Sequence, residues 1–461
     1  MFGKNRGMGD TFNFLNHFSP NSPVMTVTNL HKTIEGLKRF VHDAALDVQY
    51  RARPEDFTRE RLLPFHRVVS TILSAMKRPM DLELKVVFDL VDGLDCPTGS
   101  AFSQARRKLL SKFFVNWLEH QSELVYACPH ETFKGLRLIA VDGSVITLPN
   151  NQEIRKAFPG VTNNMGATSV LSRILCCHDV LNNHAIATCM APFVQSEVDM
   201  AFESLGRFGA GDLLIYDRQF VGWGLIRMHH LKGVPFLMRC ALTANNRVKE
   251  FVKSGKDEEM VQFKASGKSA SKLRKLGVAA KEGDLLEVRL LRVDIGANEP
   301  EVLVTSLTDT AKFPHSIFKE LYFKRWPVET FFDRLKNKLK VEIFSGTSLE
   351  VVKQDFHAMI FLANLQSMIE RANRPKVEEA TKHRRHSYQI DWNKNLGLLK
   401  PMITTLFAKG DQSKPLKELM KQMAMTRYLE PVRKGRKFSH KRRKMQRNSK
   451  HPNHANYRDA I

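Results

Sequence analysis

Two acidic residues stand in apolar segments of this chain, where a charged side chain is unexpected. Asp142 lies in the middle of GLRLIAVDGSVITLP, which predicts a strand over residues 136–148, and Asp217 ends the short apolar segment DLLIYD. An ionised carboxylate among apolar neighbours is costly unless it is paired or binds a metal. Because hard divalent cations prefer carboxylate oxygens, two such acids at the ends of neighbouring strands indicate a metal site. Either aspartate alone would equally fit a turn cap, as Asp142 would beside Gly143 and Ser144.

A third carboxylate belongs to a helical segment, LYFKRWPVETFFDRLKNKLKVEIFSG, that carries cations and a tyrosine on the same face. At 100° per residue, four side chains of this segment fall within roughly 60° of one another. They are Tyr322, Arg325, Glu329 and Lys336. We expect Pro327 to kink or restart the helix and to place Glu329 in the first turn of the second part. A surface helix with i, i+4 ion pairs, such as Arg325 with Glu329, is the alternative interpretation of the segment taken alone.

The chain as a whole carries a large excess of positive charge. It has 72 lysines and arginines against 48 aspartates and glutamates, a formal net charge of +24. A polyanionic partner is therefore expected. At roughly 100 to 200 residues per domain, 461 residues predict two to four structural units. With 43% apolar residues the chain can build large cores, which excludes a wholly disordered protein.

The cysteines and the hydropathy of the chain indicate where in the cell the protein is found. The six cysteines form no CxxC pair and no disulfide-like spacing, which fits a reducing cytoplasm. The N-terminal segment lacks the apolar core of a signal peptide, and no uncharged apolar run reaches the roughly 18 residues of a membrane span. The sequence therefore predicts a protein that is neither exported nor inserted in a membrane.

The first part of the chain, from Thr28 to about His130, has apolar residues three and four apart and is predicted to be helical. Residues 81–118 predict a helix, a turn around Asp95–Pro97 and a second helix capped by Thr98 or Ser100. Four side chains near the start of the second helix suit a major groove and its phosphates, as in a helix-turn-helix. They are Ser103, Gln104, Arg106 and Arg107. An ordinary helical hairpin with a solvated basic face is the alternative.

The middle of the chain has the pattern of an α/β sheet. After the first strand, TSVLSRILCC and HAIATCMAPF predict two strands joined by a hairpin turn at residues 179–183. A helix capped by Ser196 and Asp199, the strand DLLIYD, a helix and the strand PFLMRC follow. In such an order, side chains at strand ends form functional sites. Residues 241–305 interrupt it and predict an insertion with β content, and residues 431–461 predict a basic arm that becomes ordered, if at all, on a partner.

These motifs together resemble the DDE transposases of bacterial insertion sequences, specifically the insertion-sequence-four family. The resemblance rests on VDGSVITLP, on IYDRQF, and on a tyrosine, arginine, glutamate and lysine whose spacing matches the family signature at all four positions. It covers residues 136 to about 375. Two further segments, SAFSQARRKL and PVRKGRKFSHKRRK, also resemble parts of these enzymes.

The resemblance implies an α/β fold with a ribonuclease H-like catalytic core, interrupted by a β-rich insertion and flanked by an N-terminal all-helical region and a helical, basic C-terminus. It places Asp142 on the first strand, Asp217 on the fourth and Glu329 on a helix after the insertion. Its spacing favours Glu329 over the neighbouring acid Asp333. The three carboxylates would hold two Mg²⁺ ions, which Mn²⁺ could replace, about 4 Å apart for in-line phosphoryl transfer. The side chains that would bind DNA phosphates are Tyr322, Arg325 and Lys336.

Five segments follow from the pattern and the resemblance together. They are an N-terminal helical DNA-binding region (1–130), the first part of the catalytic domain (131–240), the β-rich insertion (241–305), the second part of the catalytic domain (306–375), and a C-terminal helical region with a basic arm (376–461).

The function that the resemblance implies is cut-and-paste transposition. The protein would bind the terminal inverted repeats of its own element and the target, both double-stranded DNA, as a homodimer in a synaptic complex. It would work in the bacterial cytoplasm in association with the nucleoid. Two alternatives remain from the residues alone: a catalytically silent DNA-binding regulator, and a ribonuclease H-like nuclease without strand transfer.

Overall fold

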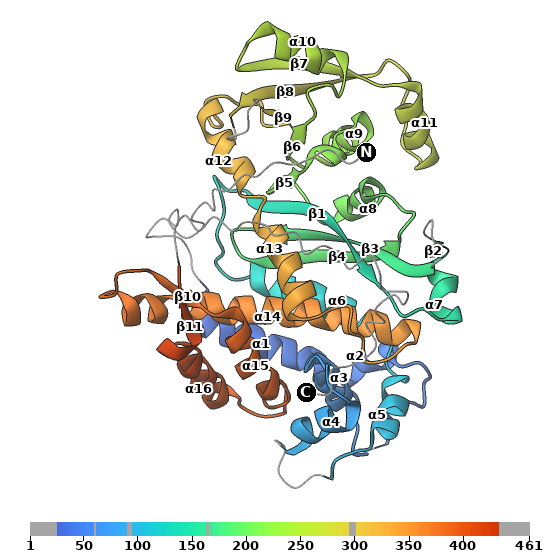
Figure 1. Ribbon diagram of the computed structural model, residues 1–461, viewed down its shortest axis with the longest axis vertical. Coiled ribbons are helices and arrows are strands. Elements are labelled where there is room, and N and C mark those ends of the chain that lie inside the picture. The colour runs from blue at the N-terminus through green and yellow to red at the C-terminus, as the bar shows by residue number, and fades with distance from the viewer. Residues whose placement is uncertain are drawn as a thin grey trace. The chain divides into compact units, whose positions relative to one another are not determined.

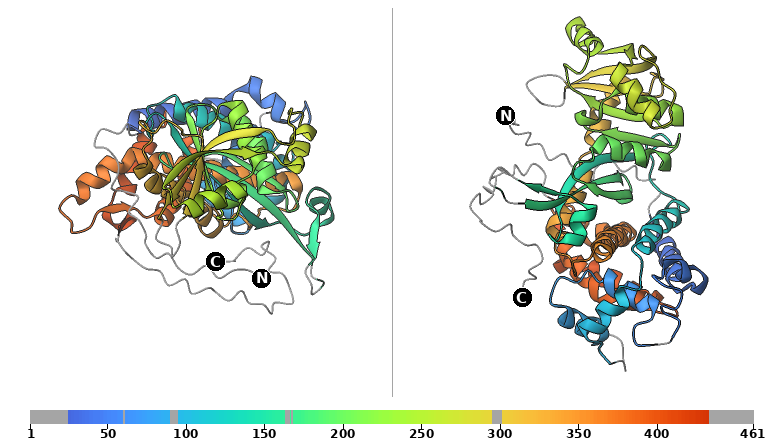
Figure 2. Two further views of the ribbon diagram at one scale, coloured as in Figure 1. Left: turned by 90° about the horizontal axis from the view of Figure 1, so that it is seen from above. Right: turned by 90° about the vertical axis from the view of Figure 1, so that its right-hand side faces the viewer.

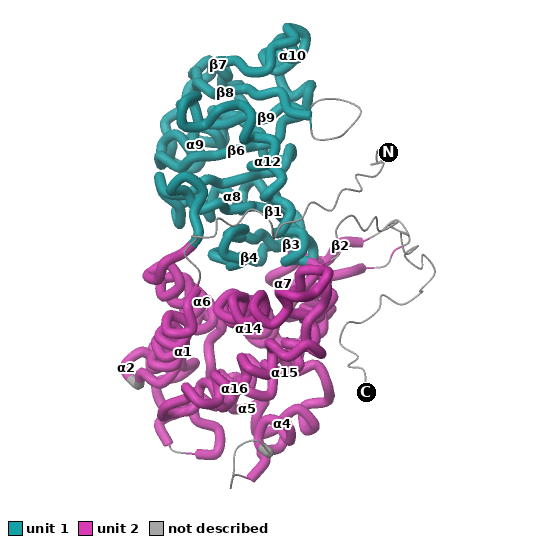
Figure 3. The backbone as a smooth tube through the Cα atoms, turned by 90° about the vertical axis from the view of Figure 1, so that its left-hand side faces the viewer, with its two compact units in different colours: residues 1–8, 131–145, 173–332 teal, residues 9–130, 146–172, 333–461 magenta. Residues whose placement is uncertain are grey.

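The structure is a computed structural model whose described residues fall into two compact units (Figure 3). The described residues are 25–59, 61–89, 95–162, 166, 168–294 and 301–432. Among them, the first unit comprises residues 131–145 and 173–294 with 301–332, and the second comprises the remainder. The predicted basic arm lies outside the described residues from 433 onward.

A mixed sheet forms the centre of the first unit. Its strands follow one another in the order β4–β3–β1–β5–β6–β9–β8–β7. Five of the strands that precede the insertion are β1 (Arg137–Thr147), β3 (Thr168–Asp179), β4 (His184–Pro192), β5 (Asp212–Tyr216) and β6 (Phe236–Cys240). Strands β1, β5 and β6 are parallel neighbours. The predicted hairpin turn is confirmed, since β3 ends at Asp179 and β4 begins at His184.

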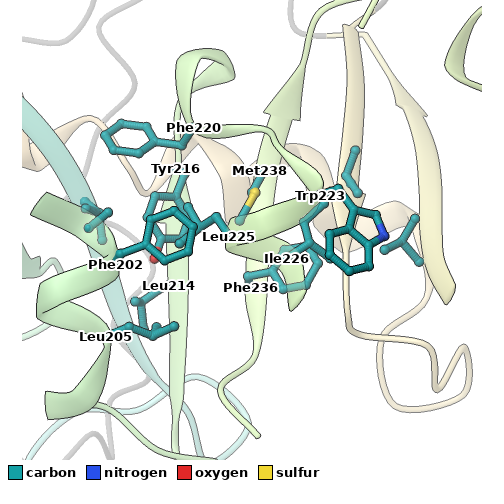
Figure 4. Close-up of a cluster of buried hydrophobic side chains, with 14 of the residues drawn as sticks. Phe202, Leu205, Leu214, Tyr216, Phe220, Trp223, Leu225, Ile226, Phe236 and Met238 are labelled. Atoms are coloured by element: carbon teal, nitrogen blue, oxygen red, sulfur yellow. The ribbon is translucent and has the colours of Figure 1, made fainter. Parts of the chain in front are cut away.

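Two layers of side chains cover this sheet because the strands alternate their side chains between its faces. On β5, Leu214 and Tyr216 pack with residues of α8 (Glu197–Ser204) and α9 (Trp223–Lys232) in one core, part of which Figure 4 shows. Leu213 and Ile215 face the opposite core, which also contains residues of α12 (Phe318–Phe323). All five residues of β5 are buried, so the residue that follows it, Asp217, leaves an apolar strand directly.

The insertion continues the same sheet. It contains α10 (Asn246–Ser254), β7 (Glu258–Lys264), α11 (Gly267–Lys275), β8 (Leu285–Val293) and β9 (Glu301–Thr305). Strand β9 pairs antiparallel with β6, β8 with β9 and β7 with β8 (Figures 1 and 2). The insertion therefore adds three antiparallel strands to a parallel edge and gives the mixed sheet its second half.

The segment with the tyrosine, arginine, glutamate and lysine spacing forms three short helices. Helix α12 ends at Phe323, α13 spans Pro327–Asp333, and a π-helical turn covers Arg334–Lys338. Pro327 begins α13 and Glu329 lies in its first turn, as predicted. The π-helical turn was not predicted. It has a wider period than an α-helix, so the spacing of 100° per residue does not hold beyond Asp333.

The second unit is helical. Its helices are α1 (Val27–His42), α2 (Ala44–Asp47), α3 (Phe65–Leu73), α4 (Met80–Asp89), α5 (Gly99–Arg106), α6 (Lys112–Tyr126), α7 (Gln152–Ala157), α14 (Leu349–Thr381), α15 (Trp392–Leu406) and α16 (Ser413–Met423). Helix α14 packs against α1, α3 and α6. At its centre Phe361 stacks on Trp117 with ring centroids 3.7 Å apart, and the Trp117 indole donates to the Leu37 carbonyl at 3.1 Å. This unit also contains β2 (Gly160–Thr162), which pairs with the first residues of β3.

The predicted second helix of the helix-turn-helix ends early. Thr98 caps α5 as expected, but the helix stops at Arg106 and α6 begins only at Lys112. Between them Leu109 forms an isolated β-bridge with Arg51, which takes the backbone out of the helix. The fold class is thus mixed α/β with a mostly helical content and a central mixed sheet. None of the helices in the described ranges is long and apolar enough to cross a membrane.

Candidate active site

The two aspartates predicted as metal ligands come from neighbouring parallel strands. In the β1–β5 ladder Val141 lies opposite Tyr216, so Asp142 and Asp217 are the next residue on each strand. Asp142 is mostly buried, with 18% of its side chain exposed, and Asp217 is 31% exposed. The parallel pairing therefore brings both carboxylates to the same end of the sheet.

Arg325 joins the first aspartate to the predicted glutamate. Its Nη1 atom lies 3.4 Å from Oδ2 of Asp142, and its Nη2 atom lies 2.9 Å from Oε1 of Glu329. The arginine lies in the turn between α12 and α13, and the glutamate lies four residues later in the first turn of α13. Only 7% of the Arg325 side chain is exposed, so these carboxylates compensate a buried cation. The ion pair expected for an ordinary surface helix thus exists, but its arginine is buried and is shared with Asp142, whereas Glu329 stays exposed.

Tyr322 holds the second aspartate. Its hydroxyl donates to Oδ1 of Asp217 at 3.3 Å, and the residue is only 2% exposed. The three segments that carry Asp142, Asp217 and Glu329 are therefore linked by two buried side chains of the signature, Tyr322 and Arg325.

The electrostatics of this cluster show an excess of negative charge. Burial raises the pKa of Asp142 to about 6; Arg325 and the Gly143 amide lower it, and Glu329 and Asp217 raise it further. Burial alone would lower the pKa of Arg325, yet Tyr322 and the carboxylates raise it well above the ordinary arginine value. Burial also raises the pKa of the Tyr322 hydroxyl, so the tyrosine stays neutral. The cluster therefore favours added positive charge.

The donor set fits a hard divalent cation. Three carboxylates supply oxygen ligands of the kind that Mg²⁺ and Mn²⁺ prefer, and their mutual repulsion would be relieved by such an ion. Within the described ranges no three histidine, cysteine or acidic side chains are already gathered around a metal position. Arg325 instead lies between Asp142 and Glu329 and occupies the place of a positive charge.

Sequence reasoning missed five residues near the two aspartates. Arg239, at the end of β6, lies with Nη1 3.8 Å from Oδ1 of Asp217 and forms a two-pronged ion pair with Glu301 of β9. Glu197, at the start of α8, accepts from Arg173 at 2.6 Å and from Gln219, two residues after Asp217. The only available signal was Gln219, which lies in the motif IYDRQF.

Two charged residues of the signature region, Asp333 and Lys336, belong to the second unit. Lys336 lies in the π-helical turn, where burial lowers its pKa and Glu342 raises it. Asp333, the acid considered as a rival of Glu329, accepts a hydrogen bond from Asn337 at 2.6 Å.

The residues predicted to contact DNA from α5 divide into two kinds. Gln104 and Arg107 are exposed and Ser103 is partly exposed. Arg106 differs from the expectation, because it is only 2% exposed and its guanidinium contacts Asp355 at 2.7 Å, Gln354 at 2.6 Å and Ser345. Arg106 therefore ties α5 to α14 and does not face a DNA groove.

Comparison with known proteins identifies the family of this chain. The family described as "Transposase DDE domain" matches residues 134–365, which include all three carboxylates. The chain belongs to the DDE transposases. Over 348 residues it is 26% identical to the transposase InsG for insertion sequence element IS4 of Escherichia coli (strain K12), covering 74% of this chain and 75% of that protein. The predicted family, the DDE transposases of the insertion-sequence-four type, is thus confirmed.

One solved structure is weakly similar to this chain. The cryo-EM structure of the piggyBac transposase synaptic complex with hairpin DNA matches with a TM-score of 0.40 and 9% identity, over 87% of this chain and 85% of that chain. DDE transposases are enzymes that act on DNA, and the family generally uses a divalent metal ion.

Proposed function

We propose that this protein excises and inserts its own insertion sequence by a cut-and-paste reaction on double-stranded DNA. The observation that carries the proposal is the convergence of Asp142, Asp217 and Glu329 on the buried guanidinium and hydroxyl of Arg325 and Tyr322. The burial of Asp142 and of the Arg325 guanidinium is costly, and this cost is explained if the three acids, which come from distant segments, serve to bind metal and phosphate.

In this proposal Asp142, Asp217 and Glu329 hold two Mg²⁺ ions, for which Mn²⁺ can substitute. When bound, these ions would activate the attacking oxygen and stabilise the leaving oxygen of the phosphoryl transfer. The protein's own side chains orient the strand. Arg325 offers a planar fork to a phosphate once the carboxylates are neutralised, and Lys336 offers a point charge. Tyr322, already bonded to Asp217, fixes the position of that carboxylate and contacts the same strand.

The order of the strands supports a ribonuclease H-like core. Strands β4, β3 and β1 precede the parallel strands β5 and β6 in the sheet, with Asp142 on the first strand and Asp217 after the fourth main strand of this core. We propose the five segments as functional domains: helical DNA binding (1–130), catalysis (131–240 and 306–375), the β-rich insertion (241–305), and a helical, basic C-terminus (376–461). Ser103, Gln104 and Arg107 are the proposed DNA contacts of the first segment.

The substrate of the proposed reaction is a pair of terminal inverted repeats, followed by target DNA. Both ends must be cleaved and then joined to the target DNA. We propose that a homodimer carries out these steps in a synaptic complex on the bacterial nucleoid. The net charge of +24 supports a polyanionic substrate, because basic proteins concentrate along phosphate backbones.

The experiment that tests this function uses purified protein and linear DNA carrying the ends of the element, with Mg²⁺ or with EDTA. The wild type is compared with Glu329→Gln and with a matched control, Glu320→Gln, which changes an exposed acid of α12 that pairs with Lys324. We expect metal-dependent end cleavage and strand transfer in the wild type and the control, and DNA binding without either reaction in Glu329→Gln.

The other outcomes distinguish the alternatives. Cleavage without joining would replace the proposal by a ribonuclease H-like nuclease. Binding by the wild type with no cleavage under any metal condition would indicate a catalytically silent regulator.

A further inference from the structure

Helix α7 has two different faces. At 100° per residue, Gln152, Arg155 and Lys156 fall within roughly 100° of one another, and Ile154 lies on the opposite side. Ile154 is fully buried, whereas Gln152, Arg155 and Lys156 are all exposed. The helix thus presents one amide and two cations outward from an apolar anchor.

The acidic residue of this helix is used for anchoring. Oε1 of Glu153 accepts from the Leu349 amide at 2.8 Å, at the start of α14. The neighbouring Asn151 donates to the Thr347 carbonyl at 2.7 Å. These two bonds fasten α7 to the start of α14 and to the segment before it. Glu153 itself is exposed, and one of its carboxylate oxygens is held by the Leu349 amide.

The arginine of the outward face is held in position. Its Nε atom donates to Oδ1 of Asn150 at 2.7 Å, and Asn150 in turn donates to the Thr168 carbonyl at the start of β3 at 3.1 Å. A guanidinium held in this way loses less conformational freedom when it binds an anion. Around it lies a shallow surface hollow lined only by polar and cationic residues: Asn150, Asn151, Gln152, Arg155 and Lys156.

The same segment connects this hollow to the lysine of the signature. Glu342 accepts from the Thr147 amide at 2.7 Å and raises the pKa of Lys336, and the chain continues from Glu342 to Thr347 and Leu349, which contact α7. A duplex bound at Lys336 has a phosphate every few ångströms along each strand, so it can continue to a second cationic surface nearby.

We propose that the α7 surface, defined as Asn150, Gln152, Arg155 and Lys156, is a contact for the phosphate backbone of double-stranded DNA. The inference rests on the proposed function and extends it to a surface outside the signature and outside α5. Arg155 forks onto a phosphate, Lys156 adds a point charge, and the amides donate to further phosphate oxygens. Along the chain, this surface lies between β1 and β3 (Figure 1).

The test measures the salt dependence of binding to the element's end DNA by fluorescence anisotropy. The double variant Arg155→Ala, Lys156→Ala should lose two phosphate contacts, so the slope of log K against log salt concentration should become shallower by about 1.8. The dissociation constant at 0.1 M salt should rise on the order of tenfold or more. A charge-preserving variant, Arg155→Lys with Lys156→Arg, should keep the wild-type slope.

The matched control removes two exposed lysines of α16, in Lys417→Ala with Lys421→Ala, and so changes the net charge by the same amount. Its slope should equal that of the wild type. Lys156→Ala alone, which disturbs no anchoring bond, should reduce the slope by about 0.9 and serves if the double variant does not fold.

The proposal is overturned if the α7 variants keep the wild-type slope, or if the α16 control loses as much as they do. This result is distinguishable from failure of the proposed function, in which the wild type itself would neither bind nor cleave end DNA. Wild-type cleavage with unchanged slopes in the α7 variants would leave the transposase function intact and remove only this surface.

Discussion

The carboxylate of Glu197 lies directly against Gly143, the residue that follows Asp142. A Cβ atom on Gly143 would come within 2.2 Å of the Cδ atom of Glu197. The same carboxylate accepts from Arg173 and from Gln219, which lies two residues after Asp217. The Glu197 side chain therefore lies against the residue after Asp142 and also binds the side chain of Gln219, close in sequence to Asp217. The absence of a side chain at position 143 is what admits it.

Gly143→Ala should for this reason reduce cleavage strongly without unfolding the protein. The added methyl group must displace Glu197, which is held on two sides, and β1 must shift together with Asp142. We expect a loss of about 10²-fold in the cleavage rate, as for other small displacements of catalytic groups. Gly206→Ala, where a Cβ atom meets nothing within 4 Å, is the control. Equal rates for Gly143→Ala and the wild type would refute the role of this contact.

The cleavage reaction should need more metal at low pH. The pKa of Asp142 is raised to about 6, so below this pH a proton competes with the metal for the carboxylate. Between pH 7.5 and 5.5 the Mg²⁺ concentration for half-maximal cleavage should rise several-fold. Cleavage rates over a Mg²⁺ series at each pH measure this shift. A half-saturating concentration that stays constant over this range would contradict the assignment of Asp142 as a ligand.

Asp142→Asn should stabilise the metal-free protein at neutral pH. Because the pKa of Asp142 is higher in the folded state than its ordinary value of 3.8, the folded state binds this proton more tightly. Stability is therefore lost as the pH rises through about 6, at a cost on the order of 2 to 3 kcal/mol once the group is ionised. Differential scanning calorimetry at pH 7.5 should show a Tm several degrees higher for the variant. Mg²⁺ should raise the Tm of the wild type and leave that of the variant almost unchanged.

Arg106→Met should destabilise the second unit far more than Arg107→Ala does. The substitution leaves Asp355 buried without its cation and Gln354 without a donor, a change that typically costs about 3 to 5 kcal/mol. Arg107 is exposed, so its removal should cost less than about 0.5 kcal/mol. Urea unfolding measures both values. Similar stabilities for the two variants would mean that Arg106 is not a structural tie.

The folded protein should lose stability as the pH falls from about 6.5 to 4. His229 is buried between the Tyr216 hydroxyl and the Val234 carbonyl, and burial lowers its pKa to about 4. The same cause lowers the pKa of His357 to about 4. The unfolded chain binds these protons first, so the stability that these two histidines contribute is complete above pH 6.5 and declines below it; this decline opposes the smaller gain from protonation of Asp142 over the same range. Urea unfolding at pH 7.5 and 5.0 tests this, and His229→Gln should flatten the dependence whereas the exposed His383→Gln should not.

The placement of the two aspartates could be predicted because short apolar segments in an α/β order form parallel neighbouring strands. Pro327 likewise marked the start of α13 by its fixed backbone angle and missing amide hydrogen. The π-helical turn at Arg334–Lys338 could not be predicted in this way, since its sequence is compatible with an ordinary helix. The angular position expected for Lys336 fails for that reason.

Other features depend on contacts between distant segments. Arg106 is the same residue type as its exposed neighbour Arg107. Only its position four residues after the buried Phe102 indicated that its side chain points into the core. The pair of Arg239 and Glu301 arises because β9 joins the sheet at β6, a pairing that no local pattern specifies. The contact of Glu197 with Gly143 depends similarly on how α8 packs beside β1.

The pairing of β6 with β9 also constrains how the protein can be synthesised. While the ribosome is still adding the insertion, β6 has β5 on one side and an unpaired row of amide and carbonyl groups on the other. Such an edge, formed by the apolar residues Phe236–Cys240, is prone to pair with other nascent chains. A polypeptide truncated before Glu301 therefore keeps this exposed edge, and premature termination within the insertion yields an aggregation-prone product that also lacks Glu329.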